Sequence, residues 1–247
     1  MACVKAAARG HVEMIRWALA ENCGWRMVLC KAAAVAGSLP ILKMARLLDC
    51  PWDGTTCSMA AHSGHLHILQ WARSQGCPWG DQTCSMAAWA GELDALKWAR
   101  AHGCPWTFRT CYHAAGGGHL EVLQWARANG AEWGIDTTFW AAITGHLELL
   151  QWATDQGCPL EPHNTCKKTI ANGHLDTVEW FMARGISLPV DAGVLAARHG
   201  HIHILKWMQA NHYTWDGATV CQEAARRGHL DVLEWARANG CDSERHV

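Results

Sequence analysis

The sequence has few charged residues, and its positive and negative charges nearly balance. Charged residues make up 17% of its 247 residues, and the formal net charge is −1, whereas an ordinary globular chain has about 25% charged residues. This balance argues against nucleic acid or an anionic membrane as a partner. No apolar run reaches about 18 residues, so no transmembrane helix is predicted. The first residues, Met1 to Lys5, lack the apolar core of a signal peptide, and we expect a cytoplasmic or nuclear protein.

Motifs for metal, phosphate and catalytic chemistry are also missing. The 13 cysteines include no C-x2-C pair, which structural zinc sites usually supply. The glycine run Gly116 to Gly118 is not followed by the Lys-Ser/Thr of a phosphate loop. A catalytic thiol needs a singular environment, whereas these thiols recur in similar settings. We therefore expect no catalysis, no metal and no cofactor, with reduced thiols. A zinc or redox protein is a disfavoured alternative.

Tryptophan is unusually frequent, with 16 Trp compared with 2 Tyr and 3 Phe. A glycine recurs every 27 or 28 residues, and His follows it in seven of the nine copies. The glycines are Gly10, Gly37, Gly64, Gly91, Gly118, Gly145, Gly173, Gly200 and Gly228. Counted from this glycine, 14 Trp lie seven or fifteen residues later, and every Cys lies seven residues before it or thirteen after it.

This period predicts nine repeats in a single domain spanning residues 1–247. The approximate repeats are 1–27, 28–54, 55–81, 82–108, 109–135, 136–163, 164–190, 191–218 and 219–247. In the third copy, Asp53 is an expected N-cap for a helix that ends near Ser63. Gly64 then stops this helix, His65 is expected to cap a second helix, and Gly76 ends it. Where the last glycine is missing, the substitutes are Asn22, Asp49 and His212, types that tolerate a positive φ.

The second helix has an apolar face so wide that we expect it to be buried on two sides. Its members in the third copy are Leu66, Ile68, Leu69, Trp71 and Ala72. Two short helices cannot bury such a face alone, so the repeats should stack into a solenoid. The two Trp positions are expected to be the main contacts between layers, with Trp79 folding back as an apolar plug. On this hypothesis Trp125→Ala would cost roughly 3–5 kcal/mol of stability.

The repeated string T-C-x-x-A-A-x-x-G-H-L-x-x-L-x-W-A-R-x-x-G resembles the ankyrin repeat, T-P-L-H-x-A-A-x-x-G-H-x-x-V-V-x-L-L-L-x-x-G-A. The resemblance covers the chain from about Met1 to His246 and is strongest in Thr56–Gly76 and Thr83–Gly103. Ankyrin repeats usually have about 33 residues, so the missing residues shorten the loop that forms the family's β-hairpin. The sequence is similar to the short ankyrin arrays of protists and large DNA viruses. It predicts an all-α, ankyrin-like solenoid of nine stacked helix–turn–helix repeats, with little or no β-hairpin.

The resemblance implies a non-enzymatic scaffold that binds another protein through its concave face. The residues that the repeat does not explain are the candidate contacts, and adjacent repeats should place them in one strip. They are Trp89, Phe108, Tyr112, His113, Phe139, Trp140 and Ile143. Other copies have Ser58, Ser85, His62 or Ala171 in such positions. Aromatic residues of this kind are enriched among interface hot spots, although some, Trp140 above all, could instead fill gaps between layers.

Two further hypotheses concern the assembly of the chain. A substrate-recognition adaptor, such as one in a ubiquitin ligase, is an alternative function, but it would need a second docking motif, and none is visible. The chain is expected to be monomeric. The N-terminal repeat offers a layer through which two chains could pair end to end.

Overall fold

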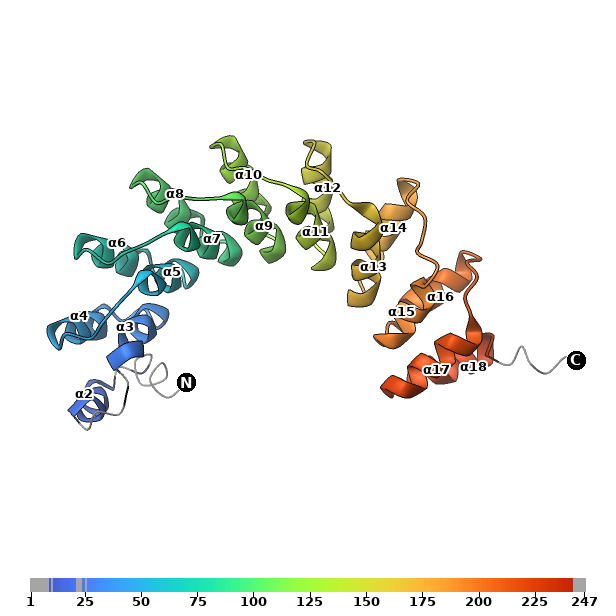
Figure 1. The fold of residues 1–247 in the computed structure, drawn as a ribbon, viewed down its shortest axis with the longest axis horizontal. Coiled ribbons are helices and arrows are strands. Elements are labelled where there is room, and N and C mark those ends of the chain that lie inside the picture. The colour runs from blue at the N-terminus through green and yellow to red at the C-terminus, as the bar shows by residue number, and fades with distance from the viewer. Residues whose placement is uncertain (1–8, 10, 21–23, 25, 242–247) are drawn as a thin grey trace, which may run out of the picture. The chain divides into compact units, whose positions relative to one another are not determined.

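The computed structural model describes residue 9, residues 11–20, residue 24 and residues 26–241. These residues form α-helices joined by short loops, and no β-strand occurs among them (Figure 1). The helices are α2 (Val12–Ala20), α3 (Arg26–Val35), α4 (Leu39–Leu47), α5 (Gly54–His62), α6 (Leu66–Ser74), α7 (Asp81–Ala90), α8 (Leu93–Ala101), α9 (Phe108–Gly117), α10 (Leu120–Ala128), α11 (Ile135–Ile143), α12 (Leu147–Asp155), α13 (Pro162–Asn172), α14 (Leu175–Ala183), α15 (Ala192–Arg198), α16 (Ile202–Ala210), α17 (Gly217–Arg227) and α18 (Leu230–Asn239).

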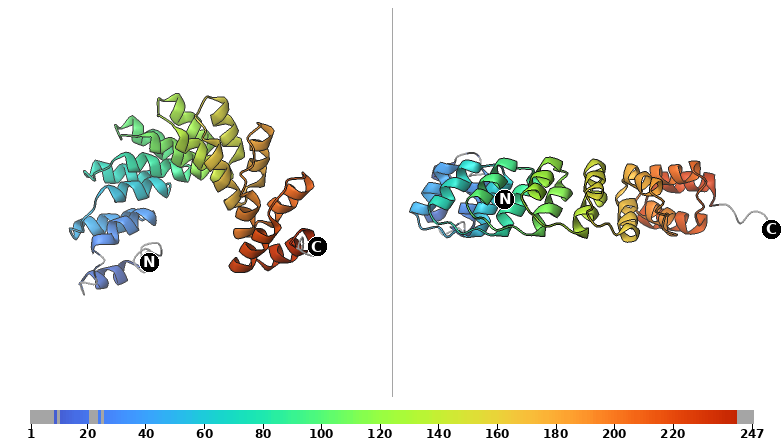
Figure 2. Two further views of the ribbon diagram at one scale, coloured as in Figure 1. Left: turned by 45° about the vertical axis from the view of Figure 1, so that its right-hand side comes forward. Right: turned by 90° about the horizontal axis from the view of Figure 1, so that it is seen from above.

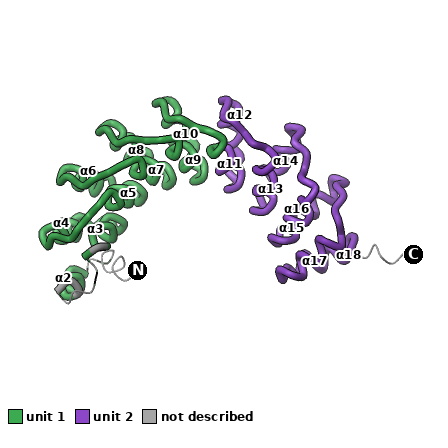
Figure 3. The backbone as a smooth tube through the Cα atoms, in the orientation of Figure 1, with its two compact units in different colours: residues 1–137 green, residues 138–247 purple. Residues whose placement is uncertain are grey.

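The chain divides into two compact units, residues 1–137 and residues 138–247 (Figure 3). From α3 onward each repeat contributes a pair of antiparallel helices. In the first unit, α5 packs on α7 and α7 packs on α9, so that the first helices of the pairs form one row. The second helices form another row beside it, which can be followed in the views of Figures 1 and 2. The second unit repeats this arrangement, with α15 packed on α13 and α17.

The predicted N-cap of Asp53 and the predicted glycine stops of the third repeat are confirmed. The Asp53 carboxylate accepts a hydrogen bond of 2.9 Å from the Thr55 amide and caps α5. Gly64 ends this helix with a φ of 71°, in the left-handed region that glycine adopts without a steric cost. Asp49 and His212, the two non-glycine substitutes within the described residues, also have positive φ values of 52° and 61°. The third substitute, Asn22, lies outside the described residues.

The two Trp positions, expected to be the main contacts between layers, are not the most deeply buried positions of the stack. In α6 the fully buried side chains are Ile68, Leu69 and Ala72, whereas Trp71 is only half-buried. The largest fully buried side chains of the described residues are leucines, isoleucines and Phe181. Branched aliphatic side chains fill the narrow space between two layers, and the wider indole ring lies at its edge.

The tryptophans nevertheless connect successive layers at that edge. Trp106, in the loop before α9, meets Trp125 of α10 edge to face, with the ring centroids 5.8 Å apart. The Arg100 guanidinium lies over Trp106 at 4.1 Å and donates a 2.6 Å hydrogen bond to the Cys104 carbonyl. Equivalent indole pairs are Trp52–Trp71, Trp79–Trp98 and Trp215–Trp235. The expected apolar plug of Trp79 is thus a half-exposed aromatic contact with the next repeat.

The histidine that follows the repeat glycine does not cap its own helix. The His65 side chain makes no capping hydrogen bond, which corrects the expectation from the sequence. Its Nε2–H donates instead to the Val35 carbonyl of the preceding repeat at 3.3 Å. His119 makes the same contact with the Trp89 carbonyl at 3.1 Å, and its ring lies against Gly91. The Gly-His pair therefore joins neighbouring repeats, because the absent Cβ of one glycine leaves space for the next histidine.

The cysteines pack as the sequence predicted, with one exception in their redox state. The nine free cysteines of the described residues are all buried. The expectation of reduced thiols throughout is wrong for Cys221 and Cys241, which form a disulfide. The two cysteine positions of a repeat face one another across its helix pair, and this proximity makes the bond possible.

A group of histidines in the second unit predicts a loss of stability in mild acid. Burial lowers the pKa of His201, and repulsion from His203, His174 and His229 lowers it further. Since an unfolded histidine has a pKa of about 6.5, the unfolded chain binds more protons at lower pH, and stability must fall as the pH drops below that value. We expect a lower melting temperature at about pH 5.5 than at about pH 7.5, and His203→Gln should reduce the difference. Equal melting temperatures at the two pH values would contradict this prediction.

Candidate functional site

Four of the predicted contact residues form a continuous chain of rings on α7 and α9. The ring of Trp89 lies 5.6 Å from that of His113, which lies 4.4 Å from Tyr112. Tyr112 in turn lies 5.9 Å from Phe108. We call these four residues, Trp89, His113, Tyr112 and Phe108, the aromatic strip. The expectation that neighbouring repeats bring such residues together is confirmed for this group.

Helix geometry and one inter-repeat hydrogen bond set the arrangement of the strip. Phe108 begins α9 and is four residues before Tyr112, so both lie on one side of the helix. The Thr107 hydroxyl caps this helix by accepting a hydrogen bond from the Arg109 amide. The His113 Nδ1 atom lies 3.2 Å from the Ser85 carbonyl, which ties α9 to α7.

The strip is partly accessible and uncharged at neutral pH. Trp89 is 36% exposed and Phe108 is 45% exposed, while Tyr112 and His113 are half-buried. Burial lowers the pKa of His113, and nearby Arg109 lowers it further, although the bond to the Ser85 carbonyl acts in the opposite direction. The neutral ring can therefore contribute to an apolar contact surface.

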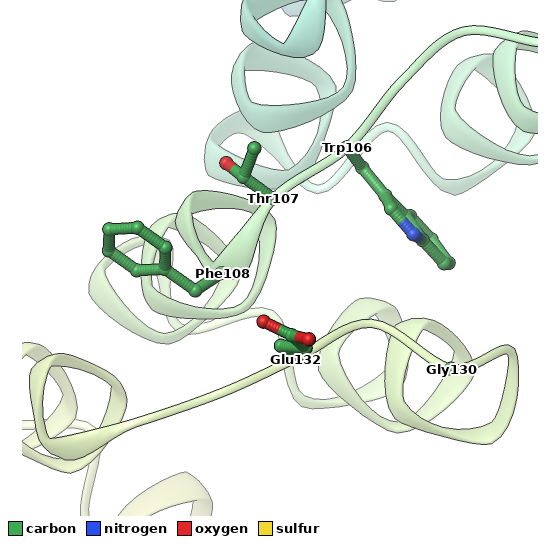
Figure 4. Close-up of a pocket in the computed structure, with 5 residues that line it drawn as sticks. All are labelled: Trp106, Thr107, Phe108, Gly130 and Glu132. Carbon is green, nitrogen blue, oxygen red and sulfur yellow. The ribbon is translucent and has the colours of Figure 1, made fainter.

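A shallow pocket of about 350 Å³ adjoins the Phe108 end of the strip. Figure 4 shows Trp106 and Phe108 pointing in opposite directions, with Glu132 on the neighbouring loop between them. Thr107 and Gly130 complete the lining. The Glu132 side chain is exposed and forms no ion pair with any residue that the structure describes. The pocket thus combines two apolar rings with one free carboxylate.

The comparisons with known proteins identify the fold. No family model matches the chain, and neither does any curated protein. Among solved structures, the ankyrin repeat domain of human ASB11 is similar to it, with a TM-score of 0.52 and 16% sequence identity. The similarity covers 73% of this chain and 96% of that domain. The chain has the ankyrin-repeat fold. Ankyrin repeats are generally protein–protein interaction modules, and solenoids of this type bind through extended surfaces.

The other three predicted contact residues lie on α11, in the second unit of the ankyrin fold. The rings of Phe139 and Trp140 are 6.2 Å apart and nearly perpendicular. Both side chains are half-buried, as is that of Ile143. The Ile143 carbonyl accepts a 2.7 Å hydrogen bond from Asn172, and the Trp140 carbonyl accepts one of 2.6 Å from Thr144. The three side chains are therefore only partly accessible.

Two features of this ankyrin surface escaped the sequence analysis. Glu132 stands where earlier repeats have Pro51, Pro78 and Pro105, and that substitution was a signal available in the sequence. The Thr107 hydroxyl, which lines the pocket, also lies 3.5 Å from Asp81. Glu132 in the pocket and Asp81 beside Thr107 thus bring two carboxylates near the Phe108 end of the strip.

The structure also bears on metal binding and membrane insertion. Over the described residues, no group of three or more His, Cys, Asp or Glu side chains is placed to hold a metal ion. None of the described helices of this ankyrin fold is both long and apolar enough to cross a membrane.

Proposed function

We propose that the chain is a non-enzymatic scaffold that binds another protein through the aromatic strip. One observation carries this proposal, namely the contact of Trp89, His113, Tyr112 and Phe108 in a single chain of rings. Earlier repeats have Ser58 and His62 at the positions equivalent to Tyr112 and Trp89. The repeat folds with these other side chains, so packing within the stack does not require the large rings.

The chemistry of the strip suits a protein partner. Trp and Tyr present large, rigid apolar surfaces with a polar group at one edge, and they are enriched among residues whose loss costs about 2 kcal/mol or more of binding free energy. Glu132 and Asp81 place carboxylates beside the rings, whereas Arg109 is the nearby cation on α9. We propose that Phe139, Trp140 and Ile143 take part in the same function on the second unit.

Exchanging strip residues for those of the third repeat is expected to weaken binding without unfolding the chain. The variant Trp89→His with Tyr112→Ser copies His62 and Ser58, which the fold already accommodates. We expect the affinity for the partner to fall about tenfold or more, equivalent to about 1.4 kcal/mol. The partner would be found by affinity capture with quantitative mass spectrometry, and its dissociation constant would be measured by calorimetry.

A substitution on the other helix row provides the control. Gln124→Ala, at an exposed position of α10, should leave both affinity and melting temperature unchanged. If the strip variant bound as tightly as the unmodified chain, the proposed surface would be wrong. If it lost its helical signal, the rings would be structural. Ligase subunits that are still captured by the strip variant would instead support the adaptor alternative, since they would use a second docking surface.

A further inference from the structure

The cysteines of a repeat occupy two positions that face one another. The first lies on the first helix, seven residues before the repeat glycine, and the second follows the second helix, thirteen residues after that glycine. The pairs in the described residues are Cys30/Cys50, Cys57/Cys77, Cys84/Cys104 and Cys221/Cys241. The last of these is a disulfide with a Cα–Cα distance of 6.3 Å, within the usual range of about 4.4–6.8 Å.

Two of the reduced pairs place their second sulfur atom as this disulfide does. The Cys241 sulfur lies 3.3 Å from the Gly217 carbonyl, eleven residues before the repeat glycine. The Cys77 thiol lies 3.4 Å from the equivalent carbonyl of Asp53. In the next repeat, the Cys104 thiol lies 3.3 Å from the equivalent carbonyl, that of Gly80. The second sulfur therefore has the same location in all three repeats.

The thiols of these two pairs also contact each other. Cys57 and Cys77 share a side-chain hydrogen bond, as do Cys84 and Cys104. In each pair this bond lowers the pKa of one thiol and raises that of the other. The pair Cys30/Cys50 differs, because the Cys30 thiol donates to the Cys50 carbonyl at 3.8 Å. Among the reduced pairs that the structure describes, the two central ones alone combine sulfur contact with the location of the second sulfur in the disulfide-bonded repeat.

We infer that Cys57/Cys77 and Cys84/Cys104 are sites of reversible disulfide formation, each linking the first helix of a repeat to the loop that follows its second helix. The oxidant would be a low-molecular-weight disulfide such as oxidised glutathione. A protein thiolate attacks one glutathione sulfur and releases the first glutathione as a thiolate, which takes up a proton. The second protein thiolate then attacks the mixed disulfide and releases the second glutathione. Two thiol hydrogens leave the protein, and one glutathione disulfide is reduced.

Burial controls the rate of this exchange. All four side chains are fully buried, so an oxidant reaches them only when the repeat opens locally. Since a disulfide constrains the open and unfolded states more than the folded state, the oxidised chain should melt at a higher temperature than the reduced chain. The sites would therefore make the stability of the central repeats depend on the surrounding thiol–disulfide potential.

Redox titration of the intact chain tests the inference without any partner. The purified protein would be equilibrated in buffers of graded ratios of reduced to oxidised glutathione, alkylated at each ratio and mapped by mass spectrometry after proteolysis. We expect linked Cys57–Cys77 and Cys84–Cys104 peptides, each lighter by two hydrogens, to accumulate as the oxidised fraction rises. Circular dichroism at each ratio would check that the chain remains folded.

Repeats with one cysteine serve as internal controls. Cys111 faces Ala131 and Cys166 faces Ile186 in the repeat register, so these thiols should gain no intramolecular link. Cys77→Ala, which copies Ala131, should leave Cys57 unlinked while Cys84–Cys104 still forms. Complete alkylation of both central pairs at every ratio would overturn the inference, and so would links that join cysteines of different repeats. Either outcome would leave the proposed protein-binding function unaffected.

Discussion

Leu123→Ala is expected to destabilise the first unit by about 2–5 kcal/mol. Leu123 is a fully buried side chain of α10, and removing most of it leaves a cavity that the rigid helix pair can close only in part. The free energy of unfolding would be measured by urea denaturation, followed by tryptophan fluorescence and circular dichroism. A loss of this size would show that buried aliphatic side chains such as Leu123 are the main contacts between layers.

Trp125→Ala provides the comparison on the same helix. Trp125 is half-buried and meets Trp106 at the edge of the layer, so its loss should cost only about 1–2 kcal/mol. This is less than the 3–5 kcal/mol that full burial would imply. If Trp125→Ala proved more destabilising than Leu123→Ala, the indole ladder would be the main contact between layers after all.

The sequence was sufficient to predict the repeat and its helix ends. A glycine spaced by 27 or 28 residues marks the repeats, and in the described part of the chain its left-handed backbone conformation favours that residue type locally. The N-cap of Asp53 depends on a hydrogen bond to an amide two residues away. Interactions within a few residues can be inferred from sequence because the chain itself fixes their geometry.

Contacts between repeats could not be inferred in this way. His65 stands at the start of a helix, where local capping is the natural expectation, yet its partner is a carbonyl 30 residues earlier. The spacing of cysteines revealed two recurring positions but not that they face one another, as Cys221 and Cys241 do. Likewise, the regular spacing of tryptophan does not reveal that rings such as those of Trp106 and Trp125 are only half-buried.

The candidate site was predictable to a similar degree. The departures of Trp89 and Tyr112 from the repeat pointed to this candidate surface, because other copies of the repeat stack with different side chains there. The order of the rings, with His113 between Trp89 and Tyr112, depends on how α9 packs on α7. The pocket at Glu132 depends on a loop from the following helix connection, which no local pattern describes.

Gly91→Ala is expected to destabilise the chain by roughly 2–3 kcal/mol through two separable effects. Gly91 has a φ of 79°, a conformation that costs an L-residue about 1–2 kcal/mol. A Cβ atom there would also lie 2.5 Å from the His119 ring, displacing the histidine that binds the Trp89 carbonyl. Urea denaturation of the variant would measure the total.

Gly103→Ala isolates the contribution of the histidine contact. Gly103 has a similar φ of 82°, but a Cβ atom there would meet no atom within 4 Å. It should therefore show only the conformational cost, while Gly91→Ala should exceed it by about 1 kcal/mol, the net value of a typical hydrogen bond. When Gly91→Ala is introduced into the His119→Ala variant, it should cost only the conformational term, because the ring that the new methyl group would displace and its hydrogen bond are already gone. Equal costs for the two single glycine variants would show that the Gly-His contact contributes little to joining the repeats, and the recurrence of that pair would then reflect the helix turn alone.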